Sequence, residues 1–468
     1  GSLWPKEEEE VFERQPRPSQ RALLDSAMQA PVIQRMIKMF VKAETYDCPK
    51  DPRAISTINP TDKLEYSRYM YSLAEHMKSM DWYAFGKNPY DIAMIVASIC
   101  SGASSASNTD LSRFDGRVSE ILRRLERLVL VRAFDSSHTN NILELHRSQY
   151  NLQGVTRNGY KYETGYARNS GSPETSVFNS IANKFMAFLA HRMTRINGAF
   201  MSPEEAYNAP GIYGGDDGLT ADIDPKIYVK AARMVGQQLE IEPLMRGEFG
   251  ISFLSRMYGP NVWYGDPNSC CDIKRQLLKF HTTTAGQQQM EPSVKLQQKA
   301  TSYYYTDHDT PYIGDIVNRV LELIGPDGGD FDPSIHTWFS QYRDMSAQFP
   351  NERADWMYEW ASETMPDFDS DLFLQWLDQA QSAEDLLRPP VCNEEPTIPD
   401  VKDDVVVDDV VVRSKSPPPA KPDKPAKKCP PKQGNVNKKH VNKKKTGPKQ
   451  SGPTGRSKAW GKKKQDSK

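Results

Sequence analysis

Two adjacent aspartates lie inside a short apolar segment, Ile212-Tyr213-Gly214-Gly215-Asp216-Asp217-Gly218-Leu219. Apolar flanks around a Gly-Asp centre predict a tight β-hairpin, because glycine takes positive φ without steric cost. A turn tolerates two neighbouring carboxylates poorly unless a cation lies between them. Mg²⁺ is the cation this pattern favours, because it binds a few carboxylates together with water and phosphate. The alternative is an ordinary turn, since Gly and Asp are common turn residues.

A third carboxylate belongs to the segment 108–115. Asp110 stands at the end of a predicted strand, and Asp115 stands just before a predicted amphipathic helix. The apolar residues with helical spacing are Val118, Ile121, Leu122, Leu125, Leu128 and Val129. A helix N-cap is the structural alternative for Asp115. Asp110 has no comparable structural role, so we expect it to meet Asp216 and Asp217.

The segment 170–179 predicts a Ser-Gly turn followed by a helix that starts near Pro173. The predicted buried stripe of this helix is Val177, Ile181, Phe185, Phe188 and Leu189. Thr175 and Asn179 are four residues apart and share one helical face, where they could hydrogen-bond a ligand. The alternative places both side chains in water.

Basic residues gather between positions 42 and 53. Lys42 and Glu44 share one side of an extended segment, and Lys50 and Arg53 follow after a turn at Cys48-Pro49. Basic residues on two strands of a hairpin can line a channel and bind triphosphate oxygens. An ordinary solvated surface is the alternative.

The net charge of −1 conceals a strong asymmetry. Residues 413–468 hold 19 Lys and Arg against two Asp, a balance of +17, and residues 1–412 have a balance of −18. An acidic body with a basic tail indicates a polyanionic partner. The Lys-, Pro- and Gly-rich tail has few side chains to bury, so we expect it to be disordered alone. A nuclear-localisation signal is the alternative for its lysine clusters.

The chain has 468 residues, enough for several domains or one large subdivided catalytic unit. Its six cysteines show no metal-binding spacing, so we expect reduced thiols in an intracellular protein. We find no transmembrane segment or signal peptide in the sequence. The chain begins Gly1-Ser2 without Met, and we therefore expect the natural protein to extend further at this end.

Together these segments resemble the palm of viral RNA-dependent RNA polymerases, and over residues 30–260 the sequence is most similar to the polymerase portion of nodavirus replicases. Asp110-x4-Asp115 resembles the first palm motif, Ser170-Gly171-x3-Thr175-x3-Asn179 the second, and Gly215-Asp216-Asp217 the third. Lys42-x-Glu44 with Lys50-x2-Arg53 resembles the basic fingers motif, and 251–256 resembles the palm–thumb hairpin.

The resemblance implies an α+β right-hand fold with fingers, a palm with an antiparallel sheet, and a helical thumb. The expected parts are an N-terminal leader (1–29), fingers (30–105), a palm with a fingers insertion (106–260), a thumb (261–390) and a disordered acidic-then-basic tail (391–468). We expect the aromatic residues of the helical thumb to be core: Trp338, Phe339, Trp356, Trp360, Phe373 and Trp376.

The resemblance also implies a site for two-metal-ion nucleotidyl transfer from NTPs, with two Mg²⁺ ions or Mn²⁺ as a substitute. The implied catalytic and metal-binding residues are Asp110, Asp216 and Asp217. The implied nucleotide-binding residues are Lys42, Lys50, Arg53, Asp115, Ser170, Gly171, Thr175 and Asn179. The implied RNA-binding residues are Arg256, Lys438, Lys439, Lys443, Lys444 and Lys445.

The implied partners are an RNA template, its nascent strand and NTPs, with self-association in a replication complex. The implied location is the host-cell cytoplasm at the mitochondrial outer membrane, reached through a membrane segment outside this chain. The family often has a lysine between the third motif and the hairpin, whereas residues 235–250 contain only Arg246 as a basic residue. We leave that role unassigned.

Three alternatives compete with this interpretation. Diguanylate cyclases share a palm-like Gly-Gly-Asp/Glu-Glu-Phe turn, but Gly218 stands where that motif has Phe, and Asp110 would have no role. Reverse transcriptases are related, but the Thr175/Asn179 pair opposite Asp115 fits ribonucleotide selection better. A non-catalytic RNA-binding replication protein acting through the basic tail is the alternative from another functional class.

Overall fold

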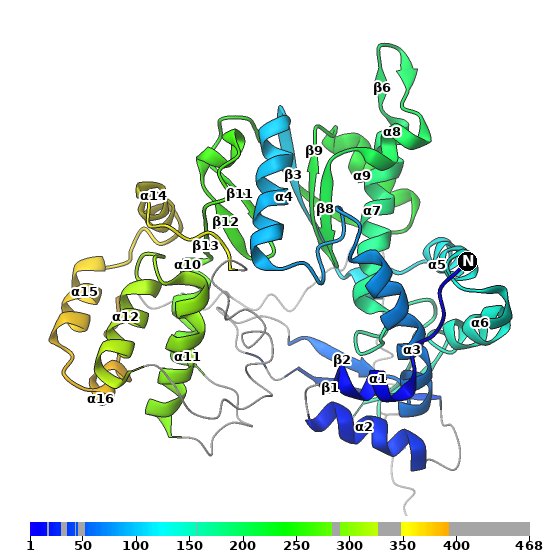
Figure 1. The fold of residues 1–468 in the computed structure, drawn as a ribbon, viewed down its shortest axis with the longest axis horizontal. Helices are drawn as coiled ribbons and strands as arrows, with labels where there is room; N and C mark the ends of the chain where they lie inside the picture. Colours follow the sequence, from blue (N-terminus) through cyan, green and yellow to red (C-terminus); the bar gives the residue numbers. More distant parts are fainter. Residues whose placement is uncertain are drawn as a thin grey trace, which may run out of the picture. The chain divides into compact units, whose positions relative to one another are not determined.

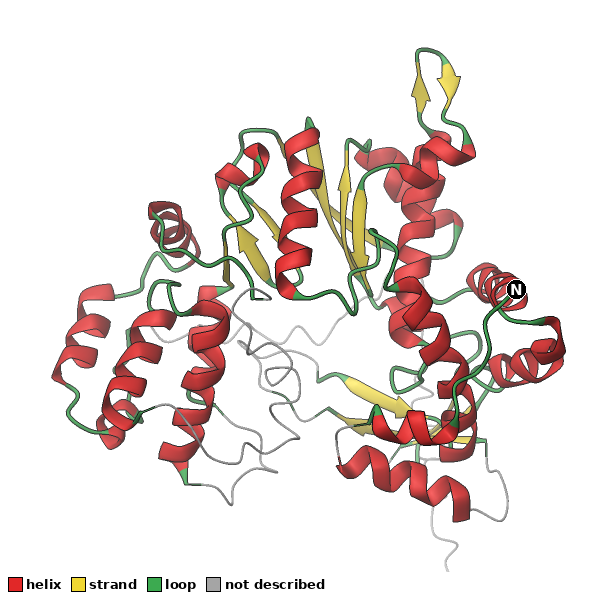
Figure 2. Cartoon of the chain, in the orientation of Figure 1, coloured by secondary structure: helices red, strands yellow, loops and turns green. Residues whose placement is uncertain are grey.

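The computed structural model describes residues 1–15, 18–29, 35–42, 44, 52–156, 158–282, 291–325 and 348–392 (Figure 1). The chain divides into a unit spanning Gly1–Pro399 and a second unit, Asp400–Lys468, which lies outside the described residues. The first unit combines helices with mainly antiparallel strands (Figure 2), so the α+β class predicted from the sequence is confirmed. The boundaries predicted within this unit stay predictions.

A four-stranded antiparallel sheet with the order β10-β3-β9-β8 carries the residues of interest. Its strands are β3 (Ser105–Leu111), β8 (Gly211–Gly214), β9 (Asp217–Ala221) and β10 (Leu239–Met245). Successive side chains of a strand point to opposite faces. Ile212 therefore packs in one core with α4 (Pro89–Gly102), while Tyr213 packs in another with α7 (Thr175–Met193) and α9 (Pro225–Met234).

A second four-stranded sheet has the order β2-β1-β4-β5. It contains β1 (Met36–Val41), β2 (Ala54–Thr57), β4 (Gln153–Val155) and β5 (Lys161–Glu163). β1 and β2 form an antiparallel pair, whereas β1 and β4 are parallel. This sheet brings residues 36–38 of β1 beside residues 153–155 of β4.

The other elements before the hairpin at 251–258 are mostly helical. They are α1 (Glu8–Glu13), α2 (Pro18–Gln29), α3 (Pro60–Met77), the 3₁₀ helices η1 (Phe114–Arg117) and η2 (Ser136–His138), α5 (Glu120–Ala133), α6 (Thr139–Arg147), α8 (Pro203–Asn208), and the small hairpin β6 (Arg195–Ile196) with β7 (Ala199–Phe200). Helices α3, α5, α6 and α7 share one apolar core that includes Tyr66, Leu130, Leu145 and Phe178.

A three-stranded meander precedes the C-terminal helices. Its strands are β11 (Ile251–Phe253), β12 (Arg256–Tyr258) and β13 (Ser269–Cys271), with η3 (Pro260–Tyr264) after β12. The helices that follow are α10 (Ile273–Phe280), α11 (Pro292–Asp307), α12 (Ile313–Ile324), α14 (Asp355–Thr364), α15 (Ser370–Gln379) and α16 (Ala383–Leu386). Leu254 and Ser255 both have positive φ in the β11–β12 turn, which confirms the short hairpin predicted there.

The aromatic residues of this helical region form its core. Trp356 and Phe373 are buried, and Trp360 and Trp376 pack against the same cluster. The predicted core role is confirmed for these four residues, while Trp338 and Phe339 lie outside the described residues. Within the described part of the chain, no helix has the length and apolar character needed to span a bilayer.

Two helices differ from their sequence predictions. Ser119, not Asp115, caps α5: its hydroxyl accepts a hydrogen bond from the Leu122 amide at 3.4 Å. Ile121 and Leu128 are exposed, and the buried face of α5 instead includes Arg123 and Glu126. The apolar pattern misplaced this face because buried ion pairs replace apolar contacts there.

The most buried face of α7 also differs from the predicted stripe. Ser180, Asn183 and Lys184 are buried, whereas Phe185 and Phe188 are only partly buried. Helix α7 lies among several elements, so polar side chains that find hydrogen-bond partners are buried with apolar ones.

Candidate active site

The two central aspartates lie in a tight hairpin turn, as the sequence predicts. Gly214 pairs with Asp217 across β8 and β9, which leaves Gly215 and Asp216 as the two turn residues. Gly215 has φ +71°, a conformation that glycine adopts without strain. A Cβ on Gly214 would lie only 3.3 Å from Leu254 of the β11–β12 turn, so the two turns approach closely.

Asp110 lies beside this turn. β3 is paired with β9 through Thr109 and Gly218, which places Asp110 one residue beyond the last pair, toward the turn. Burial raises the pKa of Asp217 to about 6, and the charges of Asp216 and Asp110 shift it in the same direction. Burial also raises the pKa of Asp216, reinforced by Asp110 and Asp115. The structure therefore places the predicted carboxylates close enough to interact electrostatically, although their oxygens do not all lie within 4.8 Å of one another.

A cleft of about 610 Å³ opens at these carboxylates. Its acidic lining residues are Asp110, Asp217, Glu240, Glu242 and Asp272. Carboxylate oxygens are the donors that hard divalent cations prefer, and an acidic cleft repels phosphate unless cations compensate. The carboxylates of Asp110 and of the hairpin turn therefore fit a divalent cation.

Helix α7 holds the turn through two residues that the sequence analysis missed. The Ser180 hydroxyl accepts a hydrogen bond from the Gly215 amide at 2.9 Å. The Asn183 amide nitrogen lies 3.1–3.2 Å from the carbonyl oxygens of Gly215, Asp216 and Asp217 and donates to them. Asn183 continues the four-residue spacing of Thr175 and Asn179, and this spacing is the signal that could have identified it.

Asp115 and Asn179 meet, as the sequence predicts. The Asn179 amide nitrogen donates a hydrogen bond to Asp115 Oδ1 at 2.9 Å, and Asn179 Oδ1 accepts one from Arg168 Nε at 2.7 Å. Arg168 is a third residue that the sequence analysis missed. Its only sequence signal is its position two residues before Ser170.

The Ser-Gly turn packs against strand β2. The Gly171 amide donates to the Ser56 carbonyl at 3.0 Å, and the Ser170 hydroxyl accepts from the Ser56 amide at 3.2 Å. A Cβ on Gly171 would lie 2.8 Å from the Ser56 carbonyl oxygen, so glycine is required for this close approach. The Thr175 hydroxyl donates to the carbonyls of Asn169 and Ser172 at 3.0 Å each, so it holds the turn in this structure.

The basic hairpin forms where the sequence predicts one. The Lys42 amide donates to the Arg53 carbonyl at 2.8 Å, continuing the β1–β2 ladder. Glu44 lies between the two side chains, with an ion pair of 2.8 Å to Lys42 and a second to Arg53. The charge of Arg53 shifts the pKa of Asp216 downward, so the basic hairpin acts electrostatically on the turn that holds Asp216. Lys50 lies outside the described residues.

The prediction that Arg256 binds RNA needs correction. Its side chain is buried, and its guanidinium donates to Asp307 at 2.8 Å and to the Ser269 carbonyl at 3.1 Å. An arginine engaged in this way stabilises the contact between β12 and α11 and does not present its charge to a phosphate. The five tail lysines, Lys438, Lys439, Lys443, Lys444 and Lys445, lie outside the described residues.

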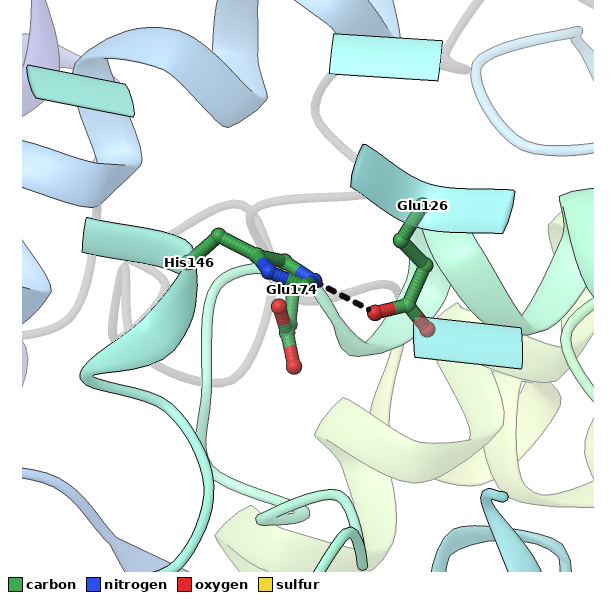
Figure 3. Close-up of side chains that lie close together, drawn as sticks. All are labelled: Glu126, His146 and Glu174. Atoms are coloured by element: carbon green, nitrogen blue, oxygen red, sulfur yellow. Dashed lines mark hydrogen bonds and ion pairs between the residues drawn. The ribbon is translucent and has the colours of Figure 1, made fainter. Parts of the chain in front are cut away.

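A second cluster of possible metal ligands lies elsewhere. Among the described residues, the one set of three or more acidic, His or Cys residues with ligand atoms within 4.8 Å of one another is Glu126, His146 and Glu174 (Figure 3). Arg123 Nη1 already lies 2.9 Å from Glu126 and 2.6 Å from Glu174. Arg168 Nη2 lies 2.6 Å from Glu126. Since two guanidinium groups neutralise both carboxylates, these residues do not fit a cation.

Several viral polymerases are similar to this chain in sequence. The chain is 33% identical over 307 residues to the RNA-directed RNA polymerase of Greasy grouper nervous necrosis virus, 34% over 307 residues to that of Striped jack nervous necrosis virus, and 31% over 334 residues to that of Flock house virus. These matches cover 65%, 65% and 68% of this chain.

This chain is a homologue of nodavirus RNA-directed RNA polymerases. It spans about 30% of the length of the curated relatives it matches. No family model matches the chain.

The structural comparison agrees with the predicted right-hand polymerase fold. The insertion-loop deletion mutant of a human picorbirnavirus RNA-dependent RNA polymerase superposes with a TM-score of 0.52. The match has 10% sequence identity and covers 67% of this chain and 64% of that chain. The fold predicted from the nodavirus resemblance is therefore confirmed.

Proposed function

We propose that this chain is the polymerase portion of a viral RNA-directed RNA polymerase that extends RNA from NTPs on an RNA template. One observation carries this proposal: Asp110 and the Asp216–Asp217 turn meet at one end of an antiparallel sheet, beside the Asp115–Asn179 pair. Acidic cation ligands next to a polar pair suited to a ribose hydroxyl support ribonucleotide transfer.

Asp110 and Asp216 would hold two Mg²⁺ ions, with Mn²⁺ as a possible substitute, and Asp217 would support the second ion. Bound divalent cations would lower the pKa of the attacking 3′-hydroxyl and neutralise the leaving pyrophosphate. The three aspartates supply hard oxygen donors on a rigid turn, which favours Mg²⁺.

The chain's own groups would position the nucleotide. Lys42, Lys50 and Arg53 would supply fixed positive charge to the triphosphate, whose charge spreads over its oxygens as the bond breaks. Glu44 keeps Lys42 and Arg53 in place beforehand, so little side-chain ordering remains when the nucleotide binds. Ser170-Gly171 would lie beside the templating base, next to strand β2.

Asp115 would accept a hydrogen bond from the ribose 2′-hydroxyl. Asn179 occupies its Oδ1, and Oδ2 has no partner among the described residues. The side chain of Asp115 is 31% exposed, so this oxygen is accessible to a ligand.

Single-nucleotide extension tests the proposal. The full chain is incubated with a primed RNA template, each NTP in turn, and Mg²⁺ or Mn²⁺. We expect addition of the templated nucleotide only, and no addition by the Asp110→Asn variant. RNA binding without extension on primed and unprimed templates would reject the polymerase and support a non-catalytic RNA-binding replication protein.

We also propose that the protein self-associates in a replication complex in the host-cell cytoplasm, at the mitochondrial outer membrane. The resemblance to nodavirus replicases is the support for this location. Fractionation of cells that make the whole natural protein tests it. Absence from the mitochondrial fraction would reject this location.

A further inference from the structure

A buried network of charged groups lies between helices α5, α6 and α7. Its members are Arg123, Glu126, His146, Arg168 and Glu174, each at most 4% exposed. Burial alone would raise the pKa of Glu126, but Arg168, Arg123 and a hydrogen bond from His146 hold this pKa well below its ordinary range. Two guanidinium groups and two carboxylates balance, so the network is neutral without a charge on His146.

Arg168 is the member that reaches the proposed nucleotide site. Its Nη2 donates to Glu126 Oε1 at 2.6 Å, and its Nη1 lies 3.0 Å from Glu174 Oε1. Its Nε donates to Asn179 Oδ1 at 2.7 Å, and its backbone amide donates to the Asp115 carbonyl at 2.8 Å. One residue thus holds the main chain of Asp115 and the side chain of Asn179.

The bond from Arg168 decides which way the Asn179 amide faces. A guanidinium only donates hydrogen bonds, so Asn179 must turn its oxygen toward Arg168 and its nitrogen toward Asp115. The opposite orientation would place an NH₂ group against a guanidinium and an oxygen against a carboxylate. With the observed orientation, Asn179 donates to Asp115 Oδ1. Oδ2 then remains available to a ligand hydroxyl.

We propose that Arg168 is a positioning residue for ribose selection, which fixes the Asn179 amide so that Asp115 presents one carboxylate oxygen to the 2′-hydroxyl. This inference rests on the proposed polymerase function and adds a residue outside the substrate's reach. The buried carboxylates Glu126 and Glu174 act through Arg168 by holding its planar group in one orientation.

The test compares two conservative variants of the same network, Arg168→Lys and Arg123→Lys. Lysine keeps the charge, but its single ammonium cannot contact Asn179 and both glutamates as the guanidinium fork does. Arg123 is the matched control, because it pairs with the same two glutamates. Its other hydrogen bonds among the described residues go to the carbonyls of Tyr166 and Ala167, not to Asn179 or Asp115. The readout is the ratio of kcat/KM for ATP to that for dATP on a primed RNA template, with the melting temperature of each variant.

We expect Arg168→Lys to lower the ATP/dATP ratio by about tenfold, the equivalent of losing one charge-assisted hydrogen bond. We expect Arg123→Lys to leave the ratio unchanged, even where it lowers the melting temperature as much. An unchanged ratio in Arg168→Lys, or equal falls in both variants, would overturn the proposal, because the network would then have a purely structural role.

Two further experiments test the inference if Arg168→Lys does not fold or if the wild-type chain is inactive. If Arg168→Lys shows no cooperative melting, the charge-balanced pair Arg168→Gln with Glu126→Gln replaces it, with the same expected fall in the ratio. If the wild-type chain extends no primer, the proposed polymerase function is rejected, independently of the role of Arg168. The ratio of ATP to dATP dissociation constants, measured with Mg²⁺, then tests Arg168 on binding alone, and equal ratios in wild type and variant would reject the inference.

Discussion

At the scale of single residues, the hairpin aspartates are held in a state that opposes their ionisation. Burial raises the pKa values of Asp216 and Asp217, and the neighbouring carboxylates add to this effect. Helix α7 nevertheless fixes the turn through three carbonyl groups, so the carboxylates cannot move apart freely. A bound cation would convert this unfavourable arrangement into a favourable one.

We therefore expect Asp110→Asn, and separately Asp216→Asn, to remove nucleotide incorporation while the melting temperature stays unchanged or rises. Removing one like charge relieves repulsion, which offsets any lost contact. Mg²⁺ should raise the melting temperature of the wild type more than that of either variant. Asp272→Asn, in the same cleft, is the control and should keep activity. Wild-type turnover in either catalytic variant contradicts the assignment.

Ribose selection is the second prediction at this scale. Asn179→Ala or Asp115→Ala should reduce kcat/KM for ribonucleotides more than for deoxyribonucleotides, because the site discriminates through a hydrogen bond to the hydroxyl. Ser119→Ala is the control: it removes the cap of α5, costs about 1 kcal/mol of stability, and should leave the ratio unchanged. Equal losses for both nucleotide types would mean that the Asp115–Asn179 pair is structural.

At the scale of elements, helix α7 joins two functions. Asn179 faces the proposed ribose site, while Ser180 and Asn183 hold the turn of the proposed catalytic aspartates. Lys184, the next residue, is buried beside Tyr207 and Tyr213, with its Nζ 5.6 Å from each ring centroid. Polar side chains of this helix therefore stabilise the β8–β9 hairpin through hydrogen bonds to its turn.

Lys184 gives this region a pH-dependent stability. Burial lowers its pKa to about 8 from an ordinary 10.5, so the folded protein binds fewer protons than the unfolded chain between these values. This group's contribution to stability therefore rises with pH across that window. Lys184→Met should raise the free energy of unfolding at pH 7, by at most about 3 kcal/mol, and by less at pH 10.

Urea unfolding at the two pH values measures this difference. Lys230→Met, which changes an exposed lysine of α9, is the matched control and should show no such pH dependence. A stabilisation by Lys184→Met that is as large at pH 10 as at pH 7 would contradict the burial argument.

The ion pair between β12 and α11 links the hairpin to the C-terminal helices. Arg256→Met would leave Asp307 buried without its partner, and we expect a loss of about 3–5 kcal/mol of stability. The salt dependence of RNA binding should not change, because the Arg256 guanidinium is not exposed. Chemical denaturation and RNA titrations at several salt concentrations measure the two effects. A reduced salt slope at full stability would restore the RNA-binding role.

At the scale of the whole molecule, charge divides the chain. Residues 413–468 carry +17 and the preceding residues −18, so a bound RNA would be held by local basic clusters rather than by the net charge. The first compact unit ends at Pro399, and the carbonyl of Cys392 within it accepts a hydrogen bond from the Asp369 amide at 2.9 Å. Truncation after Pro399 therefore removes the tail without breaking this contact.

We expect this truncation to preserve the chemical step on a preformed primer–template complex while RNA affinity falls. Each lost phosphate contact lowers the slope of log K against log salt by roughly 0.7 for single strands, so five contacts change it by about 3.5. Binding titrations over a salt series measure the slope. Tighter binding after truncation would mean that the tail competes with RNA, and an unchanged slope would assign it another partner.

The sequence by itself determined the local features. The Gly-Asp hairpin and the basic hairpin around Lys42 and Arg53 form where short-range rules predict them. The second hairpin, at 251–258, forms where the family resemblance predicts one. The spacing of the polar residues Asp115 and Asn179 also anticipated their contact, but only through the family resemblance. The conformation of a turn is set by residues adjacent in the sequence, so a single sequence is enough to predict it.

Tertiary structure decided the rest. Arg256 is buried because Asp307, distant in sequence, neutralises it, and no local pattern reveals such a partner. Arg168 could not be identified from the sequence for the same reason. Its role depends on Glu126 of α5 and on Glu174 and Asn179 at the start of α7. Apolar periodicity likewise misplaced the buried faces of α5 and α7, because a buried polar side chain costs little once another element supplies its hydrogen bonds.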